Sequence, residues 1–221
     1  PLMFTARRTA ELIKYAANAF LATKITFINE MADLAEKVGA DVQEVARGIG
    51  LDNRIGTKFL HAGPGFGGSC FPKDIRALVK VALDHDVQLR IVEAVLGVND
   101  NRKRAMARKV SNAVGGSLRG KTVAVLGLTF KPDTDDMREA PSIPLVTGLL
   151  DMGAKVRAHD PVGMEQARKE LPDIEYCDDP YECVKGADAM VIVTEWVQYR
   201  ALDWERIKSE MAQPVVVDLR N

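Results

Sequence analysis

The sequence predicts two regions of different fold class, an all-helical region followed by an α/β region with a parallel sheet. Up to residue 114 the apolar residues recur with helical spacing, and nothing there reads convincingly as a strand. Gly115, Gly116 and Gly120 then punctuate the chain, and short valine-rich runs begin to alternate with helical segments. We therefore expect a helical domain over residues 1–115 and an α/β domain over residues 116–221.

The helical region opens on a long amphipathic segment, residues 5–38, in which apolar side chains recur three or four positions apart. At about 1.5 Å per residue this helix would be roughly 50 Å long, and Gly39 suits its end. Asp41 followed by Glu44 is a capping-box pattern, which predicts the start of a second, short helix that ends near Gly50.

The same two patterns, helical spacing of apolar residues and short valine-rich runs, predict the remaining elements. Residues 121–127 form a valine-rich run typical of a buried parallel strand, and further strands are expected at 155–159, near 174, at 189–194 and at 215–219. The remaining predicted helices lie at 75–83, 89–114, 142–152, 163–171, 180–185 and 204–211.

The turn after the first predicted strand differs from a standard dinucleotide site. It contains one glycine, Gly127, where the dinucleotide fingerprint has three at fixed spacing. Lys131 would suit a phosphate as a point charge, and Phe130 would suit a base or sugar. The carboxyl ends of the strands are therefore either a nucleotide-like site or ordinary loops. The residues at these ends are Phe130, Lys131, Asp160, Glu195, Trp196, Asp218 and Arg220.

The composition excludes several other classes of protein. Thirty basic and 31 acidic side chains give a net charge of −1, which provides no general attraction to nucleic acid or membrane. No apolar run approaches the roughly 20 residues of a membrane-spanning helix, and the first residues lack a signal-peptide core. The three cysteines, Cys70, Cys177 and Cys183, match no zinc motif and suit a reducing compartment. We expect a cytoplasmic protein without a metal, nucleic-acid or membrane partner.

The strongest local signal is the loop GPGFGGSCFPKD, residues 63–74. Its glycines allow the backbone to approach a ligand closely. Cys70 stands at the threshold of a helix, where exposed N–H groups favour a thiolate. Lys73 and Asp74 follow, and Asp74 should share a helical face with the thiol. This combination suits covalent catalysis at a carbonyl, while the alternative is a tight loop with a buried cysteine.

The chain resembles the UDP-glucose/GDP-mannose dehydrogenase family, in its UDP-glucose-oxidising branch. The resemblance rests on GPGFGGSCFPKD and on ELIKYAANAFLATKITFINEMA, NRIGTKFL, GLTFKPDTDDMREAPS, TEWVQYRALD and VVVDLRN, which occur in the family's order. It implies a central helical dimerisation domain followed by a Rossmann-like UDP-sugar-binding domain. It also implies that NAD is bound mainly by an N-terminal domain absent from this chain.

The resemblance implies a reaction as well. Members of this branch oxidise UDP-glucose to UDP-glucuronate in a four-electron reaction that uses two NAD. The thiolate of Cys70 would trap an aldehyde as a thiohemiacetal, and the thioester formed next would be hydrolysed. The chain alone is expected to be inactive. The alternatives are oxidation of GDP-mannose or a UDP-N-acetylhexosamine, or a non-catalytic dimeric module that binds a nucleotide sugar.

Each matching motif of the family implies roles for particular residues of this chain. The resemblance implies catalytic roles for Cys70, Lys14, Asn18 and Asp74: Lys14 would stabilise an oxyanion, Asn18 would orient it or the attacking water, and Asp74 would activate or position that water. Without the resemblance, Lys14 and Asn18 read as a solvated pair on one helical face. The implied substrate contacts are Lys14, Asn18, Arg54, His61, Gly65, Phe66, Gly67, Phe130, Lys131 and Arg220, with Arg54 reaching a neighbouring subunit's substrate. Lys73 and Arg138 are the implied contacts to NAD.

His61 stands where relatives tend to carry lysine or asparagine, so a sugar contact there would differ from theirs. Cys177 and Cys183 are distant in sequence from the glycine-rich loop, and we expect them to be structural thiols.

Overall fold

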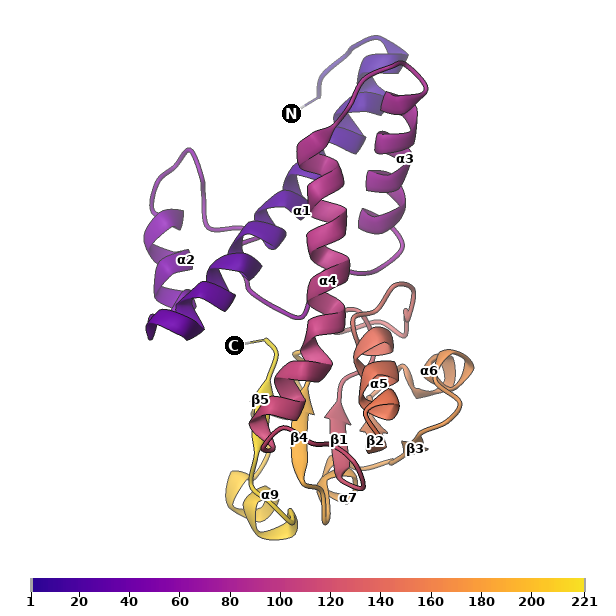
Figure 1. Cartoon of the computed structure of the whole chain (residues 1–221). Coiled ribbons are helices and arrows are strands. Elements are labelled where there is room, and N and C mark those ends of the chain that lie inside the picture. Colours follow the sequence, from indigo (N-terminus) through magenta and orange to yellow (C-terminus); the bar gives the residue numbers. More distant parts are fainter. Residues whose placement is uncertain (1, 221) are drawn as a thin grey trace. The chain divides into compact units, whose positions relative to one another are not determined.

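The computed structural model describes residues 2–220, and the chain divides between Asp100 and Asn101 into a helical unit and a sheet unit (Figure 1). The helical unit contains α1 (Arg7–Val38), α2 (Val42–Gly50), α3 (Phe71–Leu83) and the start of α4 (Arg90–Ala113). The rest of α4 and all five strands belong to the sheet unit. The predicted fold class, helical followed by parallel α/β, is confirmed.

The helix boundaries follow local sequence signals. Gly39 takes a left-handed φ of 75° and donates its N–H to the Ala35 carbonyl, which ends α1 where the sequence predicts. The Asp41 carboxylate accepts the N–H groups of Gln43 and Glu44, so the predicted cap of α2 is confirmed. The third helix begins at Phe71 rather than at residue 75, because Pro72 is favourable in a first turn, where no helical N–H partner is needed.

The sheet unit is a five-stranded parallel sheet with strand order β3-β2-β1-β4-β5. The order reverses at β1, and in open α/β sheets ligands bind beyond the carboxyl ends of the strands at such a point. The strands are β1 (Thr122–Leu126), β2 (Lys155–His159), β3 (Glu175–Tyr176), β4 (Ala189–Ile192) and β5 (Val216–Asp218).

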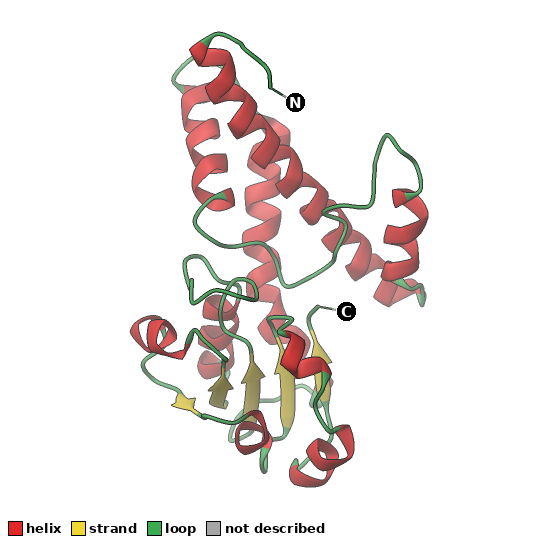
Figure 2. Ribbon diagram, turned by 180° about the vertical axis from the view of Figure 1, so that it is seen from behind, coloured by secondary structure: helices red, strands yellow, loops and turns green. Residues whose placement is uncertain are grey.

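Helices cover both faces of this sheet (Figure 2). Val123 and Val125 pack in the cluster that contains the end of α4, α5 (Ser142–Asp151) and α6 (Met164–Glu170). Ala124 and Leu126 pack in the cluster with α7 (Pro180–Val184), α8 (Val197–Arg200) and α9 (Trp204–Glu210). Alternate side chains of β1 therefore enter two separate cores. The sequence did not predict α8, because four residues are too few to show a helical period.

The two compact units divide inside α4, whereas the sequence suggests a boundary at residue 115. Met106, Ala107 and Val110 of α4 are buried in the core of the sheet unit, so this part of the helix is grouped with the sheet. Within residues 2–220 no helix has the length and apolar character needed to cross a membrane. The same residues contain no group of three His, Cys, Asp or Glu side chains suited to a metal ion.

Candidate functional site

The centre of the candidate active site is the carboxylate of Asp74, in the first turn of α3. Its side chain has no exposed surface, and three residues singled out from the sequence converge on it. Asn18 Nδ2 donates to Oδ2 at 2.8 Å, Lys14 Nζ lies 3.4 Å from the same oxygen, and Lys73 Nζ lies 2.6 Å from Oδ1. Lys14 and Asn18, four residues apart on α1, thus face the same carboxylate of α3.

These contacts determine the charge of the site. The hydrogen bond from Lys73 is the main cause that lowers the pKa of Asp74, with further lowering by Asn18 and by the charge of Lys14, while burial opposes the shift. The same hydrogen bond raises the pKa of Lys73. The carboxylate is therefore ionised at neutral pH and remains a proton acceptor beside two ammonium groups.

Cys70 lies immediately before α3 and its side chain is exposed, which excludes the alternative of a buried cysteine in this loop. The Cys70 carbonyl accepts the N–H of Asp74 at 2.8 Å, and its Sγ lies 3.7 Å from Ser69 Oγ. The thiol stands at the positive end of the α3 dipole and is open to an incoming electrophile. Cys177 and Cys183 are buried in the core of the sheet unit instead.

Two buried asparagines that sequence reasoning missed hold the glycine-rich loop. Asn29 of α1 accepts the Gly63 N–H at 2.8 Å. Asn99 of α4 accepts the Phe66 N–H at 2.8 Å and donates to the Phe66 carbonyl at 3.1 Å. A signal existed for Asn29, since it lies about three helical turns beyond Asn18 on the same face of α1. These bonds fix the loop that leads to Cys70.

The loop residues named as substrate contacts differ in exposure. His61 is exposed, Gly65 is buried with a φ of 120°, and Gly67 is partly buried. Phe66 is buried, and its ring packs edge-on to that of Phe71 with 6.0 Å between centroids. Both polar backbone groups of Phe66 are already bonded to Asn99, so Phe66 contributes to the shape of the loop.

Arg54 lies on an exposed loop after α2 and pairs with Asp52, with Nη2 2.6 Å from Oδ2. Lys24 of α1 anchors this loop: its Nζ donates to the carbonyls of Ile55 at 2.9 Å, Gly56 at 3.4 Å and Lys58 at 2.5 Å. Nothing in the sequence pattern of Lys24 distinguished it from a solvated lysine.

In the sheet unit, Phe130, Lys131 and Arg220 lie together beyond the carboxyl ends of the strands. Arg220 Nη2 lies 3.5 Å from the Phe130 carbonyl, and Lys131 Nζ lies 5.5 Å from the centroid of the Phe130 ring. Arg220 Nε donates to the Val193 carbonyl at 2.6 Å and lies 2.8 Å from Glu195 Oε2. Two cations and an aromatic ring at this edge suit a phosphorylated, ring-containing ligand.

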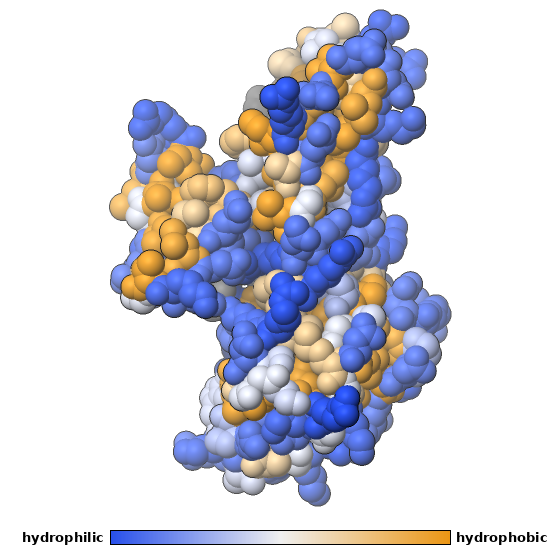
Figure 3. Space-filling model, in the orientation of Figure 1, coloured by the Kyte–Doolittle hydropathy of each residue, from blue (hydrophilic) through white to orange (hydrophobic). Residues whose placement is uncertain are grey.

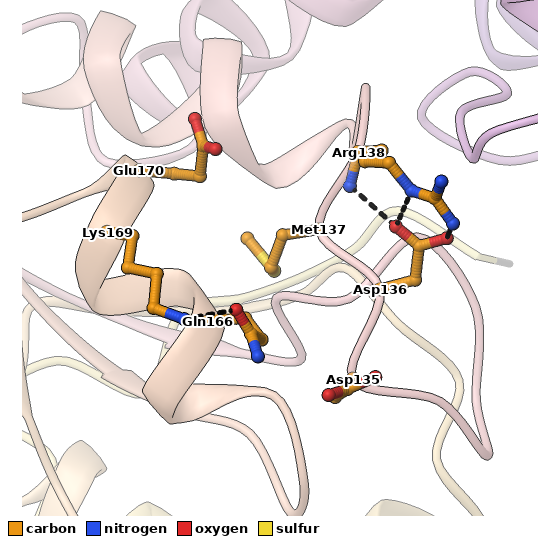
Figure 4. Close-up of a pocket in the computed structure, with 7 residues that line it drawn as sticks. All are labelled: Asp135, Asp136, Met137, Arg138, Gln166, Lys169 and Glu170. Carbon is orange, nitrogen blue, oxygen red and sulfur yellow. Dashed lines mark hydrogen bonds and ion pairs between the residues drawn. The ribbon is translucent and has the colours of Figure 1, made fainter.

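Arg138 borders a pocket of about 290 Å³ between the loop after β1 and α6. Figure 4 shows its guanidinium turned toward Asp136, with Nη2 2.7 Å from Oδ2. This pairing lowers the pKa of Asp136. The pocket is lined by Asp135, Asp136, Met137, Arg138, Gln166, Lys169 and Glu170.

Neither unit fits the standard dinucleotide site. The turn after β1 has the single Gly127, and a Cβ added there would stand 2.5 Å from Thr194 Cβ, so this turn already packs against its neighbour. Residues 63–68 have the spacing G-x-G-x-x-G, but they join α2 to α3 rather than a strand to a helix. The fingerprint requires a strand–turn–helix context, so the described residues do not provide it.

Family models match both parts of the chain. Residues 8–101 match the central domain of the UDP-glucose/GDP-mannose dehydrogenase family, and residues 124–221 match the UDP binding domain of the same family.

Individual relatives agree with the family models. A UDP-glucose 6-dehydrogenase of Rhizobium meliloti (strain 1021) is 66% identical over 221 residues, which cover 100% of this chain and 51% of the relative. A UDP-glucose dehydrogenase structure from Pyrobaculum islandicum has a TM-score of 0.91 at 42% identity, covering 100% of this chain and 50% of that one. A UDP-D-ManNAc dehydrogenase structure from Pyrococcus horikoshii has a TM-score of 0.82 at 28% identity, covering 96% and 48%. The chain thus spans about half the length of these relatives, and it belongs to the UDP-glucose/GDP-mannose dehydrogenase family.

Proposed function

We propose that this chain is the half of an NAD-dependent UDP-glucose 6-dehydrogenase that supplies the nucleophile and binds the nucleotide sugar. One observation carries the proposal: an exposed cysteine, Cys70, begins the helix whose first turn buries an ionised carboxylate, Asp74, between Lys14, Lys73 and Asn18. The choice of UDP-glucose is supported by the higher identity to proteins of that name than to a UDP-D-ManNAc dehydrogenase.

The described residues lack the strand–turn–helix fingerprint of a dinucleotide site, and in this proposal NAD is bound by a domain outside this chain. When bound there, NAD accepts the electrons of both oxidations of the sugar C6. Lys73 and Arg138 are the proposed contacts from this chain. Both already pair with a neighbouring aspartate, Asp74 or Asp136, and would have to share or leave that partner.

The chemistry of this chain begins with the C6 aldehyde of the substrate. The thiolate of Cys70 forms a C–S bond to the aldehyde carbon, and the Lys14 ammonium stabilises the resulting oxyanion. Oxidation of this thiohemiacetal gives a thioester. Asp74 then holds the water that attacks the thioester carbon, with Asn18 beside it, and cleavage of the C–S bond releases the carboxylate and returns the thiolate.

In this proposal the nucleotide part of the substrate is held in the sheet unit. Phe130 lies against the base or sugar, and Lys131 and Arg220 meet the phosphates. Because the Phe66 backbone is bonded to Asn99, we assign backbone contacts with the sugar to Gly65 and Gly67 instead. His61, exposed at the start of the loop, is the proposed variable contact.

We further propose that α1 packs against a second copy of the chain. Ile13, Phe20, Phe27 and Leu34 recur every seven residues along α1 and are 44%, 66%, 47% and 54% exposed. Such a regular apolar stripe is typical of a helix that packs against a partner. Figure 3 shows apolar side chains at the surface of the helical unit. The exposed Arg54 would reach the neighbouring subunit's substrate in this dimer.

Sedimentation velocity at micromolar concentration tests the dimer. We expect the wild-type chain to sediment as a dimer and Phe20→Asp to shift it toward monomer, because a charge would replace a buried ring at the interface. Val197→Asp is the matched control: Val197 is 76% exposed but lies on α8 of the sheet unit. A wild-type monomer, or an equal shift in both variants, would contradict the dimer through α1.

The covalent mechanism is tested by intact-mass analysis of this chain joined to the NAD-binding domain that the proposal assigns outside it. Asp74→Ala is incubated with UDP-glucose and NAD and quenched in acid. We expect a thioester adduct on Cys70, since both oxidations proceed while hydrolysis slows by about 10²–10⁴-fold. Cys70→Ser in the same background should carry no adduct, and the buried Cys177 and Cys183 serve as internal controls. Rapid turnover of Asp74→Ala without an adduct would sink the assigned role of Asp74.

A further inference from the structure

The carboxylate of Asp160, the residue directly after β2, has no exposed surface and accepts six hydrogen bonds from the protein. Its donors come from the ends of three neighbouring strands, β1, β2 and β4. Oδ2 accepts from Leu128 N at 2.7 Å, Thr129 N at 3.1 Å, Thr129 Oγ1 at 3.3 Å and Trp196 Nε1 at 3.2 Å. Oδ1 accepts from Gly163 N at 2.7 Å and Val162 N at 3.1 Å.

This arrangement differs from the usual role of an acidic residue near the end of the second strand. In dinucleotide-binding sheets such a residue hydrogen-bonds a ribose hydroxyl of the ligand. A carboxylate has about four lone-pair sites, and the six donors on Asp160 use all of them. Asp160 therefore binds the protein itself and has no capacity left for a ligand.

The hydrogen bonds of Asp160 also fix the backbone next to the proposed nucleotide contacts. The single proton of the Thr129 hydroxyl is shared between Asp160 and the Lys131 carbonyl, which lies 3.0 Å away. The Thr129 carbonyl accepts from Thr194 Oγ1 at 2.6 Å. Space around the turn is also tight, because a Cβ added to Gly163 would stand 2.3 Å from Thr129 Cγ2. These contacts fix the backbone of the turn in one conformation, and so they fix the position of Lys131.

We infer that Asp160 is a positioning residue for nucleotide binding, whose buried carboxylate holds the turn after β1 in the conformation that presents Phe130 and Lys131 to the UDP moiety. This inference rests on the proposed function, which assigns the nucleotide to that edge of the sheet. It predicts that the loss of Asp160 weakens UDP binding by more than the loss of a comparable carboxylate elsewhere in the sheet.

Asp188 is that comparable carboxylate. It lies just before β4, accepts the Thr122 N–H at 2.8 Å and pairs with Lys121 at 3.4 Å, so it holds the amino end of β1 rather than the carboxyl end. Both aspartates therefore fix backbone at an end of the same central strand. A purely structural role would give Asp160→Asn and Asp188→Asn similar effects on UDP binding once both proteins are folded.

The test is isothermal titration of the 221-residue chain with UDP, beside urea unfolding followed by tryptophan fluorescence. We expect Asp160→Asn to raise the Kd for UDP by about tenfold or more, because Asn offers a single acceptor oxygen to six donors. Thr129→Val removes only the shared hydroxyl and should raise the Kd by about three- to fivefold. Asp188→Asn should lower the unfolding midpoint and leave the Kd unchanged.

Thr129→Val carries the test if Asp160→Asn does not fold, since it keeps the side-chain shape. Unchanged Kd values in the folded variants, or an equal rise in Asp188→Asn, would overturn the positioning role and leave the proposed function standing. Failure of the wild-type chain to bind UDP at millimolar concentration would instead overturn the proposed nucleotide site, and this inference with it.

Discussion

Each unit buries one aspartate completely, but the hydrogen-bond donors around the two carboxylates differ in kind. Asp74 in the helical unit is held by side chains, and the two lysines among them, Lys14 and Lys73, are 66% and 67% exposed. Asp160 in the sheet unit is held mostly by backbone N–H groups of the turns after β1 and β2. Burial alone therefore does not distinguish a carboxylate with a proposed catalytic role, Asp74, from one that is held by the backbone, Asp160.

The difference in donors determines what each carboxylate is able to do. The two lysine side chains are largely exposed, so either one is able to turn from Asp74 to a substrate or to water while Asn18 and the other lysine stay bonded to the carboxylate. Backbone N–H groups do not leave Asp160 unless the turn itself unfolds, and a buried unpaired group costs about 1–3 kcal/mol. The donors of Asp74 are thus able to move, as its proposed role requires, whereas the donors of Asp160 are fixed in the turns.

The largest expected effect tests how rigid the turn around Asp160 is. Gly127 has a φ of 88°, and an added Cβ would stand 2.5 Å from Thr194 Cβ and 2.6 Å from Thr194 N. We expect Gly127→Ala to lower the free energy of unfolding by about 3 kcal/mol or more, from left-handed strain and overpacking together. Urea unfolding followed by tryptophan fluorescence measures this, because Trp196 and Trp204 both lie in the sheet unit.

Gly186→Ala is the matched control for Gly127→Ala. Gly186 also lies in the sheet unit and has a φ of 69°, but no atom stands within 4 Å of an added Cβ. The free energy of unfolding of Gly186→Ala should therefore fall only by the left-handed strain, about 1–2 kcal/mol. Equal losses of unfolding free energy in the two variants would show that the turn after β1 adjusts to an added methyl group. The turn around Asp160 would then be less rigid than the comparison with Asp74 requires.

The next effect concerns the charge of Asp74. Its pKa in the folded chain lies below the usual value of 3.8, mainly because Lys73 donates to it. The stabilisation by the ionised form is therefore fully present above about pH 4 and is lost as the pH falls through the folded-state pKa. We expect Asp74→Asn to cost about 2 kcal/mol at neutral pH, and this difference from wild type should shrink in acid.

Urea unfolding followed by circular dichroism of the helices, at about pH 6 and about pH 3, measures the Asp74 effect. Tryptophan fluorescence in the same samples serves as the control, because it reports the sheet unit and should respond equally to pH in both proteins. A difference between wild type and Asp74→Asn that stays constant down to pH 3 would contradict the ionised, lysine-bonded carboxylate.

Local signals predicted much of the fold, and long-range contacts account for what the sequence left open. The Asp41 cap and the Gly39 stop depend on residues a few positions away, and both appear as predicted. Asn29 and Asn99 bond to a loop more than 30 residues away in the sequence, which no local pattern specifies. The sequence pattern correctly predicted Asp160 at the end of a strand. The direction of its side chain, however, depends on donors that follow three different strands.

The smallest expected effect comes from Lys24. Its ammonium group donates to several backbone carbonyls, whereas the Asp160 carboxylate accepts from several backbone N–H groups. We expect Lys24→Met to keep the apolar stem in place and lose the bonds to Ile55, Gly56 and Lys58. A loss of about 1 kcal/mol corresponds to a roughly fivefold faster amide exchange in residues 52–59. Hydrogen–deuterium exchange followed by mass spectrometry measures it.

Lys37→Met is the matched control, since Lys37 is exposed in the last turn of the same helix. Exchange in α3 should stay unchanged in both variants, because the Asp74 contacts involve neither lysine. If Lys24→Met leaves exchange in residues 52–59 at the wild-type rate, the loop that carries Arg54 is ordered by other contacts. If exchange rises there and also around α3, Lys24 stabilises the helical unit as a whole, and a partly buried lysine then fixes structure as firmly as buried backbone donors do.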